Sequence, residues 1–211
     1  MPSLQKFQVA ALVLAAGSSK RMGSQNKLLA DMGGISMLNL TLSHMKASNA
    51  EGIYVVVGHE AELVQSSVKF KNVIFIHNPH YEKGLSTSLI KGIEALPRSV
   101  DGAVICLGDM PYVAAGTVNR LIDAFEISKG RTICVLFFEN KRGNPVLFPV
   151  ELFSEMKSLK WDKGARILIK KYADRVSRVN IQSSEILKDI DTPDQLPGTK
   201  PDPELFTSPT Q

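Results

Sequence analysis

Small and basic side chains directly follow an apolar run in the segment LVLAAGSSKRMGSQNKLL. Gly17 can adopt backbone angles that are closed to other residues, and it lets backbone amides approach a ligand. Ser18, Ser19 and the successive N–H groups can form a concave anion-binding site. Arg21 offers a planar guanidinium and Lys27 a point charge, which are the two usual ways to hold phosphate groups. Together these residues predict a phosphate-binding loop.

This loop differs from two common phosphate-binding patterns. It lacks the spacing GxxxxGK[ST], because Lys27 does not directly follow the second glycine, Gly23. It also lacks GxGxxG, so the sequence does not indicate a dinucleotide-binding fold. The alternative is an ordinary strand-to-helix turn with exposed basic residues.

Two aspartates follow apolar segments further along the chain. Asp109 ends a predicted buried strand in LGDMP, where Pro111 stiffens the chain beyond it, and Asp191 follows a short apolar run in ILKDIDTPDQL. On neighbouring strand ends, the two carboxylates would form a magnesium site, since Mg²⁺ takes one or two carboxylates and completes its octahedron with water and phosphate oxygens. Asp109 alone could equally be a helix cap or a turn residue.

Strands that alternate with helices must position these residues. Five nearly continuous apolar segments are typical of strands buried on both faces: residues 8–16, 52–58, 72–77, 102–108 and 132–138. Between them lie segments with helical spacing: SMLNLTLSHMKAS, AELVQSSV, STSLIKGIEALP and AGTVNRLIDAFEISK. This alternation predicts a parallel sheet covered by helices on both sides. Ligands of such sheets bind at the carboxyl ends of the strands.

The pattern is less regular after residue 140. RGNPVLFP predicts a turn and a short strand, PVELFSEM a helix, and DKGARILIKKYA a second helix. The last fifteen residues contain four prolines and almost no apolar periodicity. We therefore expect one domain over residues 1–196 and a mobile tail over residues 197–211.

The charge pattern limits the partners. A formal charge of +4, from 25 basic and 21 acidic residues, is too small to indicate nucleic-acid binding. Residues 139–175 hold nine basic and five acidic residues, which accounts for the whole excess. A site for an anionic acceptor and a solvated helix face explain this equally well.

The remaining features favour a cytoplasmic protein that binds no membrane. No stretch approaches the ~20 apolar residues that span a bilayer, and the N-terminal apolar run ends in the glycine loop without a convincing cleavage site. Cys106 and Cys134 lie in apolar runs, which predicts free thiols in buried strands and fits a reducing cytosol. The four histidines show no ligand-like spacing, and we expect them to be structural or surface residues.

Six motifs, in their order along the chain, resemble the MobA/MocA-like nucleotidyltransferases: LAAGSSKRMGSQNKLL, GLSTSL, GDMP, RGNPV, DKGAR and DIDTPDQ. The resemblance extends from about residue 8 to residue 196. It implies a single-domain, doubly wound α/β fold with a mostly parallel, Rossmann-like sheet. It also implies a magnesium-dependent attack on the α-phosphate of a nucleoside triphosphate, with release of pyrophosphate.

The resemblance also assigns roles to positions of this chain. Arg21, Lys27 and Asp109 would be catalytic, and Asp109 and Asp191 would hold Mg²⁺. The nucleotide-binding residues would be Leu14, Ala15, Ala16, Gly17, Ser18, Ser19, Arg21, Lys27, Gly84, Ser86, Ser88 and Asp109. The acceptor-binding residues would be Arg142, Gly143, Asn144, Pro145, Asp162 and Arg166. One position departs from the family, because Trp161 stands where the cytidylyltransferases usually have glycine.

Within this family the sequence is most similar to the molybdopterin cytidylyltransferases, which implies CTP and molybdopterin as substrates and a molybdoenzyme or its chaperone as recipient of the product. The base choice depends on LAAG, since the guanylyltransferases resemble LAGG and Ala16 adds a methyl group where a purine needs room. GTP remains an alternative, as does a sugar phosphate or methylerythritol phosphate as acceptor. A nucleotide-sensing module without turnover is a further alternative.

Overall fold

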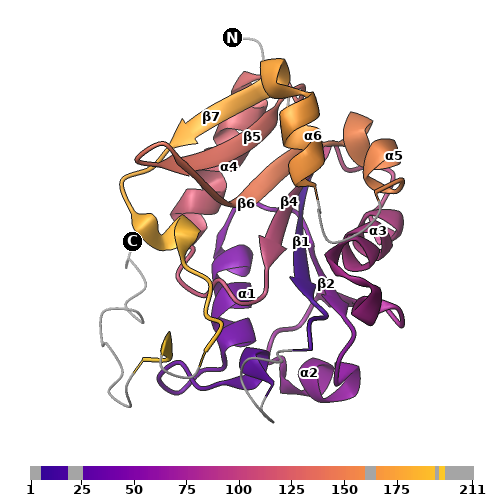
Figure 1. Cartoon of the computed structure of the whole chain (residues 1–211), viewed down its shortest axis with the longest axis vertical. Helices are drawn as coiled ribbons and strands as arrows, with labels where there is room; N and C mark the ends of the chain where they lie inside the picture. Colours follow the sequence, from indigo (N-terminus) through magenta and orange to yellow (C-terminus); the bar gives the residue numbers. More distant parts are fainter. Residues whose placement is uncertain (1–5, 19–25, 160–164, 193–194, 198–211) are drawn as a thin grey trace.

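The computed structural model describes residues 6–18, 26–159, 165–192 and 195–197. Its centre is a seven-stranded sheet with the strand order β3-β2-β1-β4-β6-β5-β7 (Figure 1). The strands are β1 (Val9–Ala15), β2 (Ile53–Val57), β3 (Val73–His77), β4 (Gly102–Leu107), β5 (Ile133–Phe138), β6 (Lys141–Pro149) and β7 (Val176–Asn180). The helices are α1 (Met37–Ala47), α2 (Ala61–Ser67), α3 (Leu85–Ala95), α4 (Ala115–Ile127), α5 (Phe153–Met156) and α6 (Arg166–Lys171).

The sheet is mostly parallel, as predicted. Strand β1 pairs in parallel with β2 and β4, and the pairs β2–β3 and β5–β7 are also parallel. Strand β6 alone runs against its neighbours β4 and β5. The five strands expected from apolar segments all form, and each end lies within one residue of the predicted bound.

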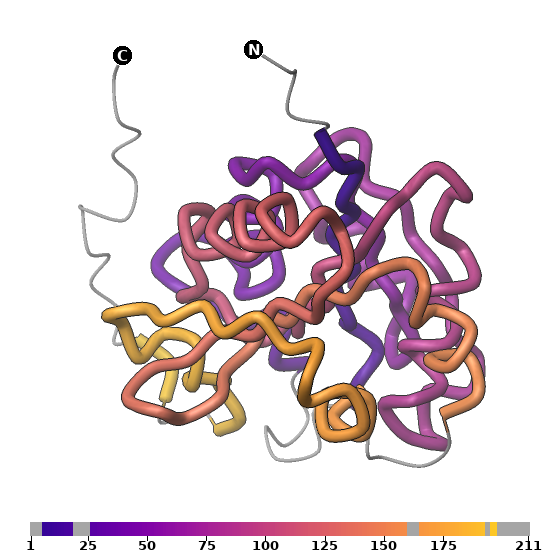
Figure 2. Tube along the Cα trace, turned by 90° about the horizontal axis from the view of Figure 1, so that it is seen from above, coloured from indigo at the N-terminus to yellow at the C-terminus, as the bar shows by residue number. Residues whose placement is uncertain are grey.

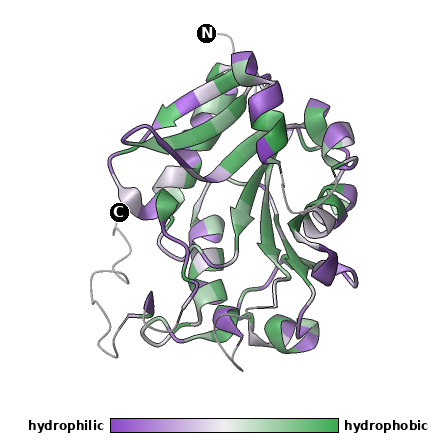
Figure 3. Cartoon of the chain, viewed as in Figure 1, coloured by the Kyte–Doolittle hydropathy of each residue, from purple (hydrophilic) through white to green (hydrophobic). Residues whose placement is uncertain are grey.

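Helices cover both faces because the buried strands are apolar on both. Ala11 and Val13 of β1 belong to a core with α1, α2 and α4, whereas Leu12 and Leu14 belong to a second core with α3, α5 and α6. Figure 2 shows α4 and α6 on opposite sides of the strands between them. Apolar residues dominate the central strands (Figure 3). The predicted doubly wound α/β fold is therefore confirmed.

The strand order reverses at β1. The chain passes from β1 to β2 on one side, and after β3 it returns to β4 on the other side of β1. At the carboxyl ends of these neighbours, Leu14 stands opposite Leu107. A crevice forms at such a switch point, since the loops that leave the two strands diverge to opposite faces.

After residue 140, one expectation is wrong and one strand was not predicted. Residues 142–145 were expected in a turn but lie within β6, where the pairing with β5 shifts register between Val135 and Phe137 and so accommodates them. Strand β7 was not expected, and residues 176–180 form the parallel edge strand beside β5. The expected helix in PVELFSEM forms as a short 3-10 turn, Val150–Leu152, followed by α5.

The two cysteines are buried and free, as predicted. Cys106 lies in β4 and Cys134 in β5. Among the described helices, none has the length and apolar character needed to cross a membrane. The boundary between a domain over residues 1–196 and a tail remains a prediction, because residues 198–211 lie outside the described part of the chain.

Candidate active site

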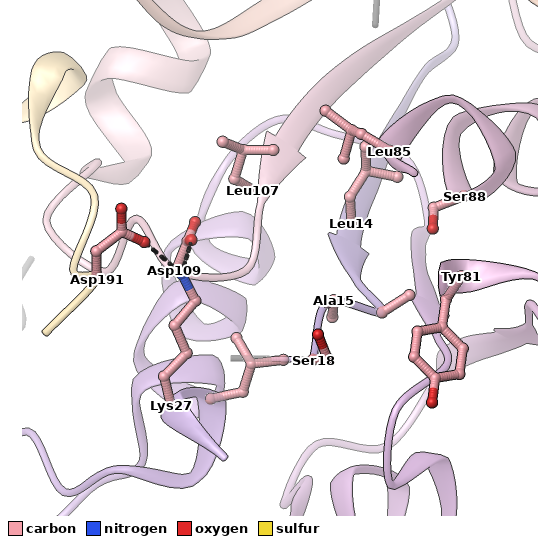
Figure 4. Close-up of a pocket in the computed structure, with 13 residues that line it drawn as sticks. Leu14, Ala15, Ser18, Lys27, Tyr81, Leu85, Ser88, Leu107, Asp109 and Asp191 are labelled. Carbon is pink, nitrogen blue, oxygen red and sulfur yellow. Dashed lines mark hydrogen bonds and ion pairs between the residues drawn. The ribbon is translucent and has the colours of Figure 1, made fainter. Parts of the chain in front are cut away.

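A cavity of about 490 Å³ opens at the carboxyl ends of β1 and β4 (Figure 4). It therefore lies at the switch point of the sheet, where the strand order reverses. Its walls are Leu14, Ala15, Ala16, Gly17, Ser18, Lys27, Leu28, Tyr81, Leu85, Ser88, Leu107, Asp109 and Asp191. Eight of these were predicted as nucleotide-binding, and Asp191 was predicted as a metal ligand.

The loop after β1 forms one wall of this cavity. Ala16 is buried, whereas Gly17 is exposed and Ser18 half-buried. Gly17 can adopt backbone angles closed to other residues, but its φ in this structure lies outside the left-handed region. Within the described part of the chain, a Cβ atom on Gly17 would meet nothing within 4 Å. Ser19 and Arg21 lie outside the described residues.

Lys27 joins the two predicted metal ligands. It begins a 3-10 helix, Lys27–Leu29, which the side chain of Asn26 caps by accepting a hydrogen bond from the backbone N–H of Leu28. The Nζ atom of Lys27 lies 2.5 Å from Oδ2 of Asp109 and 2.9 Å from Oδ1 of Asp191. One ammonium group therefore serves two carboxylates (Figure 4).

The backbone holds Asp109 and Asp191 together. The N–H of Gly108 donates to the carbonyl of Leu14, which fixes the end of β4 beside β1. The N–H of Ile190 donates to the carbonyl of Asp109. The expectation that Asp191 ends a neighbouring strand is wrong: it lies in a loop, and the Gln195 side chain accepts its N–H at 2.7 Å. The two carboxylates meet nonetheless, because this loop attaches to the end of β4.

Burial and charge act against each other in this cluster. Burial lowers the pKa of Lys27, but the carboxylates of Asp109 and Asp191 outweigh it and raise that pKa above its usual value. Burial raises the pKa of Asp109, and Lys27 offsets this only in part. Both pKa values are therefore raised, which favours the charged form of Lys27 and the neutral form of Asp109. An added cation would favour the charged form of Asp109.

The donor set fits one divalent cation. Oδ1 of Asp109 is buried and has no hydrogen-bond partner among the described residues, and such a buried carboxylate oxygen is costly unless a cation or donor reaches it. The described residues contain no cluster of three or more His, Cys, Asp or Glu side chains that could enclose a metal. A cation held here would thus have two carboxylates and open positions for other oxygen ligands, which suits Mg²⁺ bound to phosphates.

The opposite side of the cavity is formed by the start of α3 and the turn before it. Ser88 lines the cavity, as expected for a nucleotide-binding residue. Gly84 precedes α3 with φ = 107°, a conformation that favours glycine. Ser86 is buried in α3 and is not among the cavity-lining residues. Tyr81 also lines the cavity, although the sequence analysis did not predict it. Its position, three residues before the GLSTSL motif, is the sequence feature that could have indicated it.

A second cavity, of about 730 Å³, adjoins the first. The two share Leu14, Leu85 and Leu107 as lining residues. Three of the predicted acceptor residues line this second cavity: Arg142, Asn144 and Arg166. Gly143 and Pro145 are buried in β6 instead, and a Cβ atom on Gly143 would lie 2.5 Å from the carbonyl oxygen of Ile186. Asp162 and Trp161 lie outside the described residues.

The second cavity is electropositive. Burial lowers the pKa of Arg142, and the positive charge of Arg166 lowers it further. Among the described residues, no carboxylate forms an ion pair with either guanidinium. Lys170 lies on the same wall. Such a group of cations favours an anionic ligand.

Fold and site together define a Rossmann-like nucleotidyltransferase. The chain belongs to the family of the MobA-like NTP transferase domain, whose model matches residues 11–176. It is 30% identical over 200 residues to the purine catabolism protein PucB of Bacillus subtilis (strain 168), which covers 86% of this chain and 91% of PucB. It is 35% identical over 138 residues to the bifunctional protein GlmU of Clostridium acetobutylicum, which covers 63% of this chain but spans only 29% of GlmU.

Solved structures agree with this assignment. The crystal structure of Rv0371c from Mycobacterium tuberculosis H37Rv has a TM-score of 0.79 and 26% identity, and the match covers 90% of this chain and 95% of that one. A second structure of Rv0371c is a complex with manganese; it has a TM-score of 0.72 and 24% identity, with coverage of 83% and 89%.

Proposed function

We propose that this protein transfers CMP from CTP to the terminal phosphate of molybdopterin, with Mg²⁺ as the metal, and releases pyrophosphate. The observation that carries the proposal is the pair of adjoining cavities, one with Lys27 and two carboxylates, the other with Arg142 and Arg166. Because the cavities share three lining residues, ligands in both can meet at the common wall. Bringing two reactants together in this way supplies much of the rate enhancement of a transfer reaction.

The residues of the first cavity suit the charge changes of nucleotidyl transfer. Charge accumulates on phosphate oxygens during this reaction, so the protein mainly positions the two reactants and neutralises the charge on these oxygens. Asp109 and Asp191 would hold Mg²⁺, which neutralises phosphate charge when bound. Lys27 supplies a further cation, and the space beside Gly17, open among the described residues, leaves room for phosphate oxygens near the loop amides. No nucleophilic side chain is needed.

The second cavity suits a phosphate-bearing acceptor. Arg142 and Arg166 can bind the terminal phosphate of molybdopterin, and their mutual repulsion makes an added anion favourable. The six family motifs support molybdopterin as the acceptor. The choice of CTP depends on Ala16, which lines the first cavity and adds a methyl group where a purine would need room.

A grid of substrates tests the proposal. The protein is incubated with Mg²⁺, each of CTP, GTP, UTP and ATP, and each of molybdopterin, a sugar phosphate and methylerythritol phosphate, and pyrophosphate release is measured. The proposal expects the fastest release with CTP and molybdopterin. Preference for GTP overturns the base assignment, and preference for another acceptor overturns molybdopterin. Tight nucleotide binding without pyrophosphate release in any combination indicates a nucleotide sensor.

A further inference from the structure

The first cavity has two chemically different sides. Lys27 and the two carboxylates lie at one side, whereas Tyr81 and Ser88 lie at the other, with the loop after β1 between them (Figure 4). The first side is charged and suits phosphates and a cation. The second side offers an aromatic ring, a hydroxyl group and the aliphatic side chain of Leu85, which are groups that bind a planar heterocycle.

The ring of Tyr81 is packed directly on the backbone of Gly58, which follows β2. A Cβ atom on Gly58 would lie 2.7 Å from Cβ and Cγ of Tyr81, closer than such atoms approach. The φ of Gly58 lies outside the left-handed region, so the close approach of the ring, and not the backbone angle, requires glycine here. The Tyr81 hydroxyl lies 3.5 Å from Nδ1 of His59.

Asn78 fixes the turn that carries Tyr81. Its side chain is fully buried and donates to Oγ1 of Thr87 at 2.9 Å and to Oγ of Ser88 at 3.0 Å. Its side-chain oxygen accepts the N–H of His80 at 3.0 Å. These three bonds join the end of β3 to the first turn of α3, so Tyr81 and Ser88 are held in a fixed relation to each other.

We propose that Tyr81 is a nucleoside-contacting residue whose ring stacks on the base of the bound nucleotide, with Gly58 and Asn78 as its positioning residues. The proposal rests on the proposed nucleotidyl transfer, since it takes the phosphates to bind at the Lys27 side. A rigid ring on the opposite wall of the cavity gives the base a preformed surface. Stacking is tolerant of base identity, so Tyr81 adds affinity for any nucleotide and leaves base choice to other residues.

The test separates the base from the phosphates by using two probes, CTP and inorganic tripolyphosphate, each titrated calorimetrically with Mg²⁺. Tyr81→Leu should weaken CTP binding by about 5-fold or more, since about 5-fold is the smallest loss of affinity expected when one stacked base loses its aromatic partner. It should leave tripolyphosphate binding unchanged. Tyr81→Phe keeps the ring and removes only the contact with His59, so it should retain CTP affinity.

Gly58→Ala tests the support of the ring, because its new Cβ atom must displace Tyr81. We expect it to weaken CTP binding and spare tripolyphosphate. Gly116→Ala is the matched control, since a Cβ atom there meets nothing within 4 Å, and it should change neither titration. Tyr172→Leu is a second control, because Tyr172 lines neither cavity.

Each outcome has a distinct meaning. Equal weakening of CTP and tripolyphosphate binding in Tyr81→Leu would show that Tyr81 supports the fold of the cavity, which overturns the stacking role. Unchanged CTP binding in a folded Tyr81→Leu protein overturns the inference alone. A wild-type protein that binds no nucleoside triphosphate overturns the proposed function together with the inference. Circular dichroism establishes that each variant is folded.

Discussion

Lys27 and Asp191 lie far apart in the sequence, yet the Nζ atom of Lys27 contacts Oδ1 of Asp191 at 2.9 Å while it contacts Oδ2 of Asp109 at 2.5 Å. The ammonium group thus lies between the two carboxylates that would hold a divalent cation. A metal ion bound here would therefore compete with Lys27 for the negative charge of these carboxylates. A bound triphosphate gives Lys27 another anionic partner and relieves this competition.

The first prediction follows from the competition. Lys27→Met removes the ammonium group and keeps the side-chain length, so Mn²⁺ should bind more tightly to the nucleotide-free variant than to the wild type. CTP should bind more weakly by roughly 10- to 150-fold, which corresponds to the loss of one charge-assisted contact of about 1.5–3 kcal/mol. Electron paramagnetic resonance measures free Mn²⁺ in each titration. Lys69→Met, at an exposed lysine, is the control, and unchanged Mn²⁺ affinity in Lys27→Met would contradict the prediction.

The second prediction concerns the basic cavity. Arg142→Ala and Arg166→Ala should each impair use of the acceptor by about 10-fold or more, and CTP affinity should change much less, since both arginines line the second cavity and not the first. The KM for the acceptor and the Kd for CTP are measured on the same preparations. Arg98→Ala removes an exposed arginine as the control. If KM for the acceptor and Kd for CTP rise by the same factor, these arginines support the nucleotide cavity or the fold and do not bind the acceptor specifically.

The third prediction concerns the buried thiols. Burial, with a smaller contribution from Asp109, raises the pKa of Cys106 to about 12, and burial raises that of Cys134 to about 11. The thiolate is the reactive form, so neither cysteine should react with an aromatic disulfide reagent at pH 8 until the protein is unfolded. The pKa values of both thiols are higher in the folded than in the unfolded protein. Their contribution to the free energy of unfolding is therefore fully present below pH 9.0 and is lost as the pH rises toward 11–12. Rapid labelling of the native protein at pH 8 would refute the assignment.

The sequence predicted the parts of the fold that are determined by local pattern. Strands β1, β2 and β4 are buried on both faces, so their apolar residues are continuous and easily recognised. Strand β7 was missed because it lies at the sheet edge and has apolar residues only at Val176 and Val179, of which only Val179 is buried. Residues 142–145 contain glycine, asparagine and proline, which predicted a turn; they lie instead in β6, where the pairing with β5 is irregular between Arg142 and Val146.

The site was predictable where a residue directly follows a strand. Asp109 and the loop beginning at Ala16 lie at the carboxyl ends of β4 and β1. The alternation of strands and helices in the sequence had predicted these positions. The position of Asp191 depends on a tertiary hydrogen bond, from the N–H of Ile190 to the carbonyl of Asp109, which no local pattern specifies. The contact of Tyr81 with Gly58 joins two different loops, so only the structure could reveal it.

The central claim is that the cavity at the ends of β1 and β4 carries out nucleotidyl transfer with a metal held by Asp109. The most direct measurement is pyrophosphate release by Asp109→Asn, which keeps the shape of the side chain and removes its charge, with saturating CTP, Mg²⁺ and molybdopterin. The variant should remain folded and lose activity by about 100-fold or more, as expected when a main electrostatic contribution to the transition state is removed. A folded Asp109→Asn protein that releases pyrophosphate at a near wild-type rate would contradict the claim.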